Sequence, residues 1–321
     1  MSAPSTTVDL KQAKEEAVKL LLRPNSNVVG VGIGKKVKDG KETPEDCVRV
    51  YVVSKSCPND LSPNSLVPPT FLDVPSDVIE VGRFGRKGKQ SKMPAYTTPQ
   101  PGSPIRVNTN SPNVNAGVIG TLGAVVTDGK NRYILSCNHI LRRNGRVLEK
   151  EATVVSAVFV GEQEEIATPG QFIDLDHYGG NSVDCALALL QNAEKVQATF
   201  PDDLKLSSSA PITPTPGKVT KLGAVTGRTY GTIVDIDADL YIDYSFGTFL
   251  LEHQVMIDGG SDTDLFAAAG DSGSIVVDQG KGQATAIIFA ASGRFAVACP
   301  LETALQQLTE KAGVSKLEVV T

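Results

Sequence analysis

The sequence Gly270-Asp271-Ser272-Gly273-Ser274 lies directly before an apolar run and decides how this chain is interpreted. Glycine tolerates backbone conformations that other residues avoid, so this stretch suits a tight turn that presents its serine. We predict that Ser272 is a nucleophile and that the backbone at Gly270, Asp271 and Ser272 forms an oxyanion hole, with the Gly270 and Ser272 N–H groups as its donors. The second glycine follows the serine at once, which departs from the G-x-S-x-G elbow of α/β-hydrolases.

A serine hydroxyl needs a base within hydrogen-bond reach, and the base needs a partner that orients it. His139 follows a strand-like run and is predicted to lie at the rim of a barrel. Asp184 stands at the head of an apolar run, where a carboxylate must be paired or hydrogen-bonded. The order His139, Asp184, Ser272 is that of the triad in chymotrypsin-type peptidases.

Other histidines and aspartates were candidates for the same roles. His177 lies in a polar stretch and His253 in a predicted strand, and for both we expect an exposed or otherwise bonded side chain. Asp174 and Asp176 remain alternatives to Asp184 as the acid, although they lie in loop sequence flanked by glycine.

Composition narrows the class of protein. Hydrophobic residues make up 40% and charged residues 21% of the 321 residues, as in ordinary globular proteins. The net charge of −5 argues against binding of nucleic acid through its phosphates. Without a long apolar run or a signal pattern at the start, we expect no membrane association and a cytoplasmic location. The five scattered cysteines, two of them (Cys137 and Cys185) close to the predicted triad, are expected to be reduced and mostly buried.

Residues 1–85 are predicted to form a small α+β domain with a regulatory or pro-domain role. Residues 8–23 carry apolar side chains at helical spacing. In the segment from Val29 to Gly34, apolar residues alternate with glycine, which predicts a strand that another element approaches closely. Asp39 and Gly40 mark a turn.

Residues 86–116 are rich in proline and polar residues, so we predict a linker. Residues 117–321 instead show short strand patterns separated by turn signals, which is typical of paired antiparallel barrels. We place the first barrel at about 117–205, the second at about 206–300 and a C-terminal helix at 301–312. The strand patterns span 118–127, 131–137, 153–160, 184–190, 218–235, 238–243, 249–256, 273–278, 283–291 and 295–299.

The chain resembles the chymotrypsin-like serine peptidases of the trypsin superfamily. Its histidine segment is similar to the HtrA-type pattern, and the whole is closer still to the bacterial and plant trypsin-like proteins of the NARROW LEAF 1 group. The segments that carry the resemblance are Gly120 to Val126, Tyr133 to Leu141, Val29 to Lys35, Asp77 to Gly82, Thr226 to Gly231 and Gly270 to Asp278.

This resemblance implies a mainly β fold of two antiparallel six-stranded β-barrels with a C-terminal helix, preceded by the small α+β domain. The active site would lie between the barrels, with His139 and Asp184 from the first and Ser272 from the second. It implies hydrolysis of an amide or ester through an acyl-enzyme, with no cofactor and no metal. His139 would be the general base, Asp184 would orient it and Ser272 would attack.

Two features of this chain depart from secreted family members. Those members pair the aspartate before the serine with a freed N-terminus, and here only Val118-Ile119-Gly120 is faintly similar to such a start. The partner of Asp271 is therefore open.

The predicted substrate pocket is apolar. Phe266 stands six residues before the serine, where the family sets charge preference, and Phe289, Ala290 and Ala291 fall at the pocket wall. This pattern favours a small or apolar side chain before the scissile bond. Two alternatives stay open because of acidic residues nearby. Asp262 and Asp264 could favour a basic substrate side chain, or they could bind calcium together with Asp258.

The leading hypothesis is an intracellular serine endopeptidase that acts on a protein or peptide and is restrained or targeted by its N-terminal domain, as in a zymogen or regulated protease. The alternatives are a non-catalytic binding or scaffold protein on a peptidase fold, and an acyl hydrolase that is not a peptidase. Whether the chain forms a homo-oligomer is left open.

Overall fold

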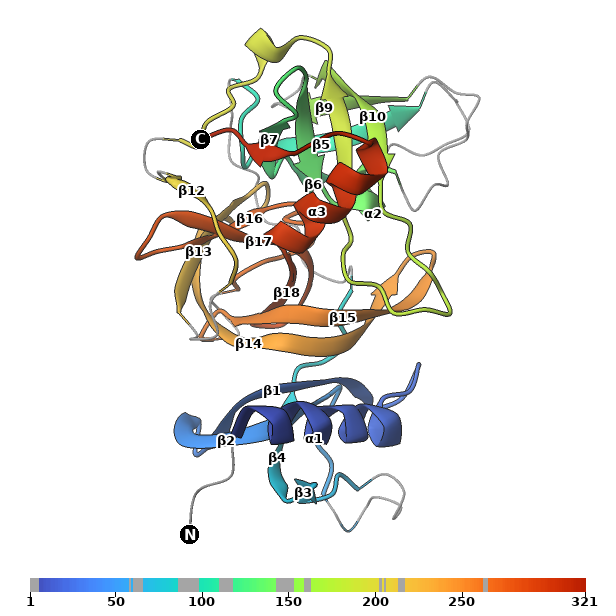
Figure 1. Ribbon diagram of the computed structural model, residues 1–321, viewed down its shortest axis with the longest axis vertical. Helices are drawn as coiled ribbons and strands as arrows, with labels where there is room; N and C mark the ends of the chain where they lie inside the picture. Colours follow the sequence, from blue (N-terminus) through green and yellow to red (C-terminus); the bar gives the residue numbers. More distant parts are fainter. Residues whose placement is uncertain are drawn as a thin grey trace.

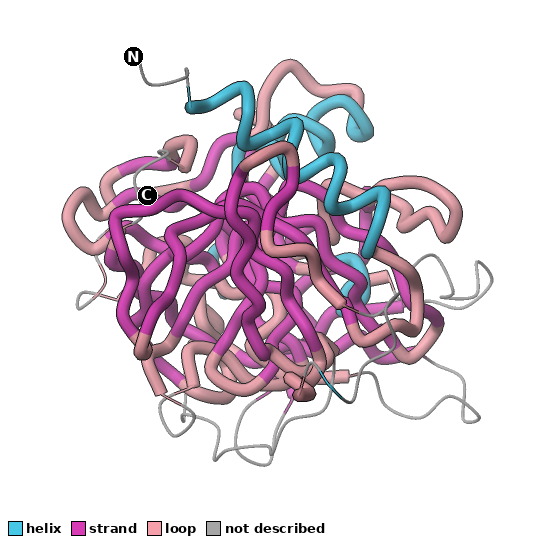
Figure 2. Tube along the Cα trace, turned by 90° about the horizontal axis from the view of Figure 1, so that it is seen from below, coloured by secondary structure: helices cyan, strands magenta, loops and turns pink. Residues whose placement is uncertain are grey.

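The structure is a computed structural model that describes residues 6–57, 59, 66–85, 98–109, 118–142, 153–158, 163–201, 204, 206–212, 217–261 and 265–321. These residues are mainly β and form two sheets, and the strands make up most of the molecule (Figure 2). None of the helices in the described residues is both long and apolar enough to cross a membrane.

The N-terminal unit packs one helix against a small sheet at one end of the molecule (Figure 1). The helix buries Ala13 and Ala17 against the strands. The hairpin between the first two strands turns at Asp39 and Gly40, whose φ angles of 51° and 74° explain the predicted turn. The elements are α1 (Thr6–Leu21), β1 (Val28–Lys38), β2 (Lys41–Val52), β3 (Thr70–Phe71) and β4 (Val74–Glu80).

The first barrel runs in the order β5-β9-β10-β11-β8-β7. Strand β6 pairs with β5 and leads after two residues into β7, so it connects the two ends of this order. The strands are β5 (Pro104–Thr109), β6 (Gly120–Thr121), β7 (Ala124–Thr127), β8 (Arg132–Ser136), β9 (Thr153–Val158), β10 (Gln163–Phe172) and β11 (Ala186–Leu190).

Six further strands close into a second barrel, because the order β13-β16-β17-β18-β15-β14 is completed by pairing of β14 with β13. Strand β14 has 18 residues, and its second half extends beyond β13 to pair with β1 of the N-terminal unit. The strands are β13 (Lys218–Gly223), β14 (Gly227–Tyr244), β15 (Gly247–Asp258), β16 (Ile275–Asp278), β17 (Gln283–Ser292) and β18 (Phe295–Pro300).

The C-terminal segment connects the two barrels. Helix α3 (Leu301–Ala312) has the predicted bounds and ends at Gly313, whose φ of 66° is the left-handed cap that glycine favours. The helix packs on β17 and β18 of the second barrel and on β10 of the first. The final strand β19 (Glu318–Val319) then pairs with β7.

The structure corrects two of the predicted boundaries. The segment predicted as a linker, 86–116, contains β5, because Ile105 and Val107 are apolar and bury against β9 in the first barrel. The pattern 218–235 is a hairpin rather than one strand, because Gly227 has a φ of 64° and reverses the chain. Between 86 and 117 the structure describes only residues 98–109.

The glycines of β1 allow β14 to approach closely, as the alternating pattern predicted. A Cβ atom on Gly30 would lie 2.2 Å from Leu240 Cδ2, and one on Gly32 would lie 1.9 Å from Asp235 Oδ2. Asp235 is buried and accepts a hydrogen bond of 2.7 Å from the Tyr51 hydroxyl. The joint between the N-terminal unit and the second barrel is therefore a glycine-lined contact around a buried carboxyl group.

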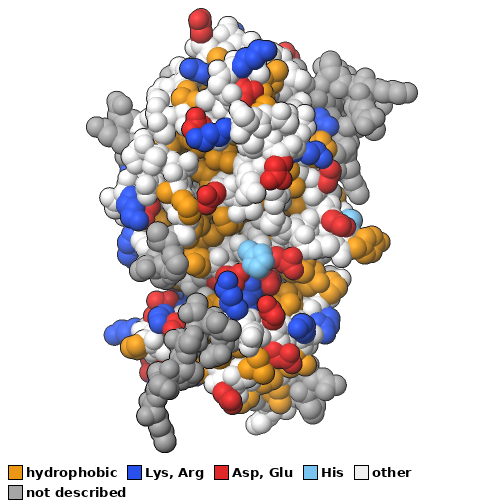
Figure 3. Space-filling model, in the orientation of Figure 1, with side chains coloured by type: hydrophobic (Ala, Val, Ile, Leu, Met, Phe, Trp, Pro, Cys, Tyr) orange, Lys and Arg blue, Asp and Glu red, His pale blue; other side chains and the backbone are white. Residues whose placement is uncertain are grey.

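Figure 3 shows acidic and basic side chains gathered along the boundary between the N-terminal unit and the second barrel. Lys14 of α1 lies 2.9 Å from carboxylate oxygens of both Asp237 and Asp239 on β14. The exposed His253 also contacts Asp237, at 2.6 Å. Charge pairing thus supplements the strand pairing between these two units.

We expect Gly32→Ala to lower the free energy of unfolding by about 1–3 kcal/mol, because the added methyl group overpacks the joint. Denaturant unfolding measures the change. Gly280→Ala is the matched control, since its nearest atom would lie 3.4 Å away. Equal stability of the two variants would contradict the close approach.

A second prediction concerns pH. Burial raises the pKa of Asp235 to about 6, above its ordinary value of 3.8. The folded protein therefore retains a proton that the unfolded chain has lost, so this group's contribution to stability falls as pH rises from about 4 to about 6. Because asparagine cannot ionise, wild type should lose about 3 kcal/mol relative to Asp235→Asn between pH 4 and pH 7. Unfolding curves of both proteins across this range test it, and a stability difference independent of pH would contradict it.

Candidate active site

The pairing of β8 with β11 brings the predicted base and acid together. Ser136 at the end of β8 lies opposite Ala186 at the start of β11. His139 comes just after that end of β8, on the short helix α2 (Asn138–Leu141), and Asp184 comes just before β11. His139 Nδ1 lies 2.5 Å from Asp184 Oδ2, and the His139 backbone N–H donates to Asp184 Oδ1 at 3.1 Å.

Asp184 has a third donor that the sequence did not indicate. It is fully buried, and the Tyr244 hydroxyl at the end of β14 donates to its Oδ2 at 2.8 Å. Burial opposes ionisation of Asp184, but the charge and hydrogen bonds of His139, together with Tyr244, hold its pKa below the ordinary value. Asp184 is thus an ionised acceptor that fixes the His139 ring. Tyr244 lies far from the triad motifs in sequence, so no local pattern could have revealed it.

The loop that carries Ser272 is tied to the first barrel through Thr121 of β6. The Thr121 N–H donates to Ser272 O at 2.8 Å, and its hydroxyl donates to Gly270 O at 2.9 Å. Gly273 has a φ of 100°, and a Cβ there would lie 2.4 Å from Thr121 O. These contacts fix the position of the nucleophile loop of the second barrel relative to His139 in the first.

Asp271 is the buried support of this loop, and the structure identifies its partners. Its carboxylate accepts hydrogen bonds from the backbone N–H groups of Val225 (2.9 Å), Thr226 (3.1 Å) and Ala268 (2.9 Å). The Thr226 hydroxyl donates at 2.6 Å, and Lys221 Nζ lies 3.3 Å from Oδ2.

Lys221 supplies the positive charge that pairs with Asp271. It is completely buried on β13 and also donates to Gly227 O at 3.0 Å and to the Thr226 hydroxyl. Burial lowers the pKa of Lys221, while Asp271 opposes that change. Both members of the pair belong to the second-barrel part of the chain.

Two backbone donors are available for an oxyanion. Among the hydrogen bonds of the described residues, none uses the N–H of Gly270 or of Ser272. The Asp271 N–H, by contrast, donates to Ala268 O at 2.9 Å. The prediction that Asp271 is part of the oxyanion hole is therefore corrected. Its N–H closes the turn, and its buried carboxylate supports the loop.

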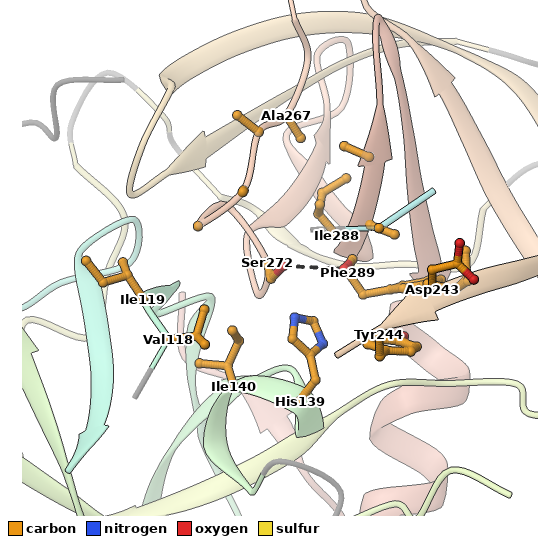
Figure 4. A pocket seen from close by; sticks show the side chains of 17 residues that line it. Val118, Ile119, His139, Ile140, Asp243, Tyr244, Ala267, Ser272, Ile288 and Phe289 are labelled. Carbon is orange, nitrogen blue, oxygen red and sulfur yellow. Dashed lines mark hydrogen bonds between the residues drawn. The ribbon is translucent and has the colours of Figure 1, made fainter. Parts of the chain in front are cut away.

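His139 and Ser272 point into one pocket of about 510 Å³ (Figure 4). The Ser272 hydroxyl donates to Phe289 O at 3.3 Å in this structure. The walls are mostly small and apolar, and the residues that come from the turn before Ser272 and from β17 are Ala267, Ala268, Ala269, Gly270, Ile288, Phe289, Ala290 and Ala291.

Three of the four predicted pocket residues lie in this wall: Phe289, Ala290 and Ala291. The prediction for Phe266 is wrong. Its ring is fully buried and packs in the interior of the second barrel with Val219 and Ile257, where burial of an aromatic side chain is favourable.

The remaining acids and histidines lie apart from this chemistry. His177 stacks on Phe249 with ring centroids 4.1 Å apart, and Asp174 pairs with Lys311 at 3.6 Å. The Asp176 carboxylate accepts from the Tyr178 N–H.

Of the three acidic residues considered for a calcium site, Asp262 and Asp264 lie outside the described residues. Asp258 is bound by Arg294 at 2.9 Å.

The buried cysteines near the triad are thiols. Cys137, Cys185 and Cys299 are free, and burial raises the pKa of each, to about 12 for Cys299. Cys137 Sγ lies 3.2 Å from Ile288 O. Such thiols behave as small packing residues.

No protein-family model matches this sequence, and a search of curated proteins finds no match. Among solved structures, the Nocardiopsis protease NAPase is similar at 15% identity and a TM-score of 0.46, over 69% of this chain and 100% of that one. Protease A of Thermobifida fusca shares 17% identity at a TM-score of 0.44, over 69% and 97%. The chymotrypsin of Cellulomonas bogoriensis shares 15% at 0.42, over 69% and 97%.

These neighbours are chymotrypsin-like serine proteases. The two sheets and the C-terminal helix described above are consistent with the chymotrypsin-like double β-barrel fold, as the sequence predicted.

We expect Lys221→Met to leave Asp271 as an unpaired buried carboxylate, which costs about 3–5 kcal/mol. The nucleophile loop should lose its geometry, and reaction of Ser272 with a fluorophosphonate should slow by about 100-fold or more, the effect of losing an oxyanion donor. Lys218→Met is the matched control, because Lys218 is exposed on the same strand and donates only to Thr232. Wild-type labelling and stability in Lys221→Met would show that the pair is dispensable.

Proposed function

We propose that this chain is a serine peptidase that cleaves peptide bonds through an acyl-enzyme. The observation that carries the proposal is the convergence of the bonded His139–Asp184 pair, Ser272 and two available backbone N–H donors on one apolar pocket. Each of these parts has a defined task in acyl transfer.

In the proposed reaction, the Ser272 hydroxyl first turns from Phe289 O toward His139. His139 Nε2 takes the hydroxyl proton while Ser272 Oγ bonds to the substrate carbonyl carbon. The N–H groups of Gly270 and Ser272 stabilise the resulting oxyanion. His139 then gives its proton to the leaving amine as the C–N bond breaks. A water molecule repeats the sequence on the ester, which releases the acid and restores Ser272.

Asp184 acts through His139 rather than on substrate. Its carboxylate keeps the proton of the neutral imidazole on Nδ1, so that Nε2 is free to accept. It also stabilises the imidazolium that forms in each step. Tyr244 and the His139 N–H occupy its remaining acceptor positions, so the carboxylate has little freedom to rotate.

The proposal has three further parts. They are membership of the NARROW LEAF 1 group, a cytoplasmic location and a regulatory role of the N-terminal unit. The first is supported by the Thr226-Gly227-Arg228-Thr229 element. Its threonines have structural tasks, since Thr226 holds Asp271 and the Thr229 hydroxyl donates to Phe266 O at 2.6 Å. The third is supported by Gly85, the residue at the end of the N-terminal unit that lines the pocket.

A non-catalytic scaffold is the second candidate. It is favoured by the hydrogen bond from the Ser272 hydroxyl to Phe289 O, which directs the hydroxyl to the backbone of β17. A covalent probe separates the two functions, because only an assembled triad and oxyanion hole activate this serine.

We expect a fluorophosphonate to add once to the wild-type protein, and neither Ser272→Ala nor His139→Ala to be labelled at a comparable rate. Hydrolysis should fall by about 10⁶-fold in either variant, since triad members act as a unit. His253→Ala is the control histidine, exposed and distant from the pocket, and should be labelled like wild type. Intact mass spectrometry gives the count of adducts. An unlabelled wild-type protein would favour the scaffold.

A further inference from the structure

The edge of β17 that faces the pocket has two carbonyl groups positioned to bind an extended peptide. This edge is paired with β16 as far as Ile288, whose N–H donates to Ser274 O at 2.9 Å. A β-bulge then follows, because the register with β18 shifts between Ile288 and Ala290. A bulge turns the next peptide groups to the other side. As a result, the Phe289 and Ala291 carbonyls both face away from β18, toward the pocket side.

A substrate would add to this edge as an antiparallel strand. Its scissile carbonyl must lie at Ser272, which already contacts Phe289 O at 3.3 Å. The N–H of the residue before the scissile bond therefore falls near Phe289 O. In an extended chain, alternate N–H groups face the same neighbour, so the N–H two residues further back would meet Ala291 O.

The chain's own Gly85 takes that second position. Its N–H donates to Ala291 O at 3.4 Å, and the two residues form an antiparallel bridge. On its other side Gly85 bridges to Asp243, whose N–H donates to Phe84 O at 3.0 Å. Gly85 also lines the pocket, together with Asp243 and Ala291.

The segment that ends at Gly85 is firmly held. The Phe84 side chain is completely buried in the main core. A Cβ on Gly85 would lie 2.7 Å from Asp243 O, and one on Gly82 would lie 2.7 Å from the Ser292 hydroxyl, so both glycines allow close contact with the barrel. Displacing this segment would expose the Phe84 ring, and the loss of that apolar burial opposes the displacement.

We propose that Gly85 is a specificity-determining residue that fills the third substrate position on the acyl side. Substrates that contribute two residues before the scissile bond then fit the groove, whereas a third residue meets Gly85. The endopeptidase expected from the sequence becomes a peptidase that acts close to the N-terminus of its substrate. This inference rests on the proposed peptidase function.

The test is a series of alanine peptides with free N-termini, from one to four residues, each linked to p-nitroaniline. Alanine suits the small apolar pocket. For wild type, kcat/KM should rise from one residue to two and then fall about 10-fold or more at three. For Gly85→Ala, whose methyl group is incompatible with the contact to Asp243, the third residue should be accepted to within about 3-fold of the second.

Gly217→Ala is the matched control and should behave as wild type, because the added methyl group would have its nearest neighbour 3.9 Å away. Phe84→Ala releases the same segment by another route and should also accept the third residue. Thermal unfolding of each variant shows whether it is folded; if one is not, the other decides.

Two results would overturn the inference. The first is a wild-type kcat/KM that keeps rising to four residues, which would mean that substrate displaces the segment ending at Gly85. The second is a fall of kcat/KM at three residues that persists in both Gly85→Ala and Phe84→Ala. Labelling of Ser272 by a fluorophosphonate is measured alongside. If Ser272 is labelled and peptides are cleaved without the length effect, the role of Gly85 is contradicted and the proposed peptidase function stands. If the protein is neither labelled nor active, both the role of Gly85 and the proposed peptidase function are contradicted.

Discussion

The buried carboxylate of Asp271 is the constraint on which the rest of the site depends. An ionised group without solvent must be compensated fully, and here three backbone N–H groups, one hydroxyl and one ammonium group from two segments converge on it. The hydrogen bonds to that carboxylate fix the turn from Ala268 to Ser272. In this turn the N–H groups of Gly270 and Ser272 make no hydrogen bond among the described residues. Catalytic geometry thus follows from the requirement to compensate one buried charge. Because Lys221 is part of the same barrel, the requirement is met as the barrel folds.

The two halves of the site come from different barrels, and hydrogen bonds at a narrow interface hold them in register. Thr121 contacts the carbonyls of Gly270 and Ser272 at once, so the nucleophile loop cannot shift relative to β6 without losing both bonds. The interface admits no side chain at Gly123, where a Cβ would lie 2.0 Å from Gly273 O. Alignment within a few tenths of an ångström matters because acyl transfer depends steeply on the placement of reacting atoms.

The sequence alone could predict the mainly β fold, the C-terminal helix and the residues His139, Asp184 and Ser272, of which His139 and Ser272 line one pocket and Asp184 is bonded to His139. Each has a local signal: strand-length apolar runs, a glycine cap, and a serine between glycines. It could not predict Tyr244, Lys221 or Gly85, since their roles depend on contacts between residues far apart in the chain. Phe266 was misplaced for a related reason: counting back from the serine gives a position along the loop, but packing decides which way the ring turns. Strand β5 was missed because the prolines around it resemble those of a linker, although Pro104 is the first residue of the strand, a position that tolerates proline.

The long strand β14 runs from the N-terminal unit to the pocket that holds Ser272. Its first half closes the second barrel with β13, its second half pairs with β1, and its last residues, Asp243 and Tyr244, lie at the pocket. Tyr244 orients the acid of the triad, and Asp243 holds the segment that ends at Gly85. One strand therefore links the N-terminal unit, the carboxylate that orients the base and the far end of the substrate groove. The glycine-lined joint at Gly30 and Gly32 packs against this same strand, so the joint and the site share one structural element.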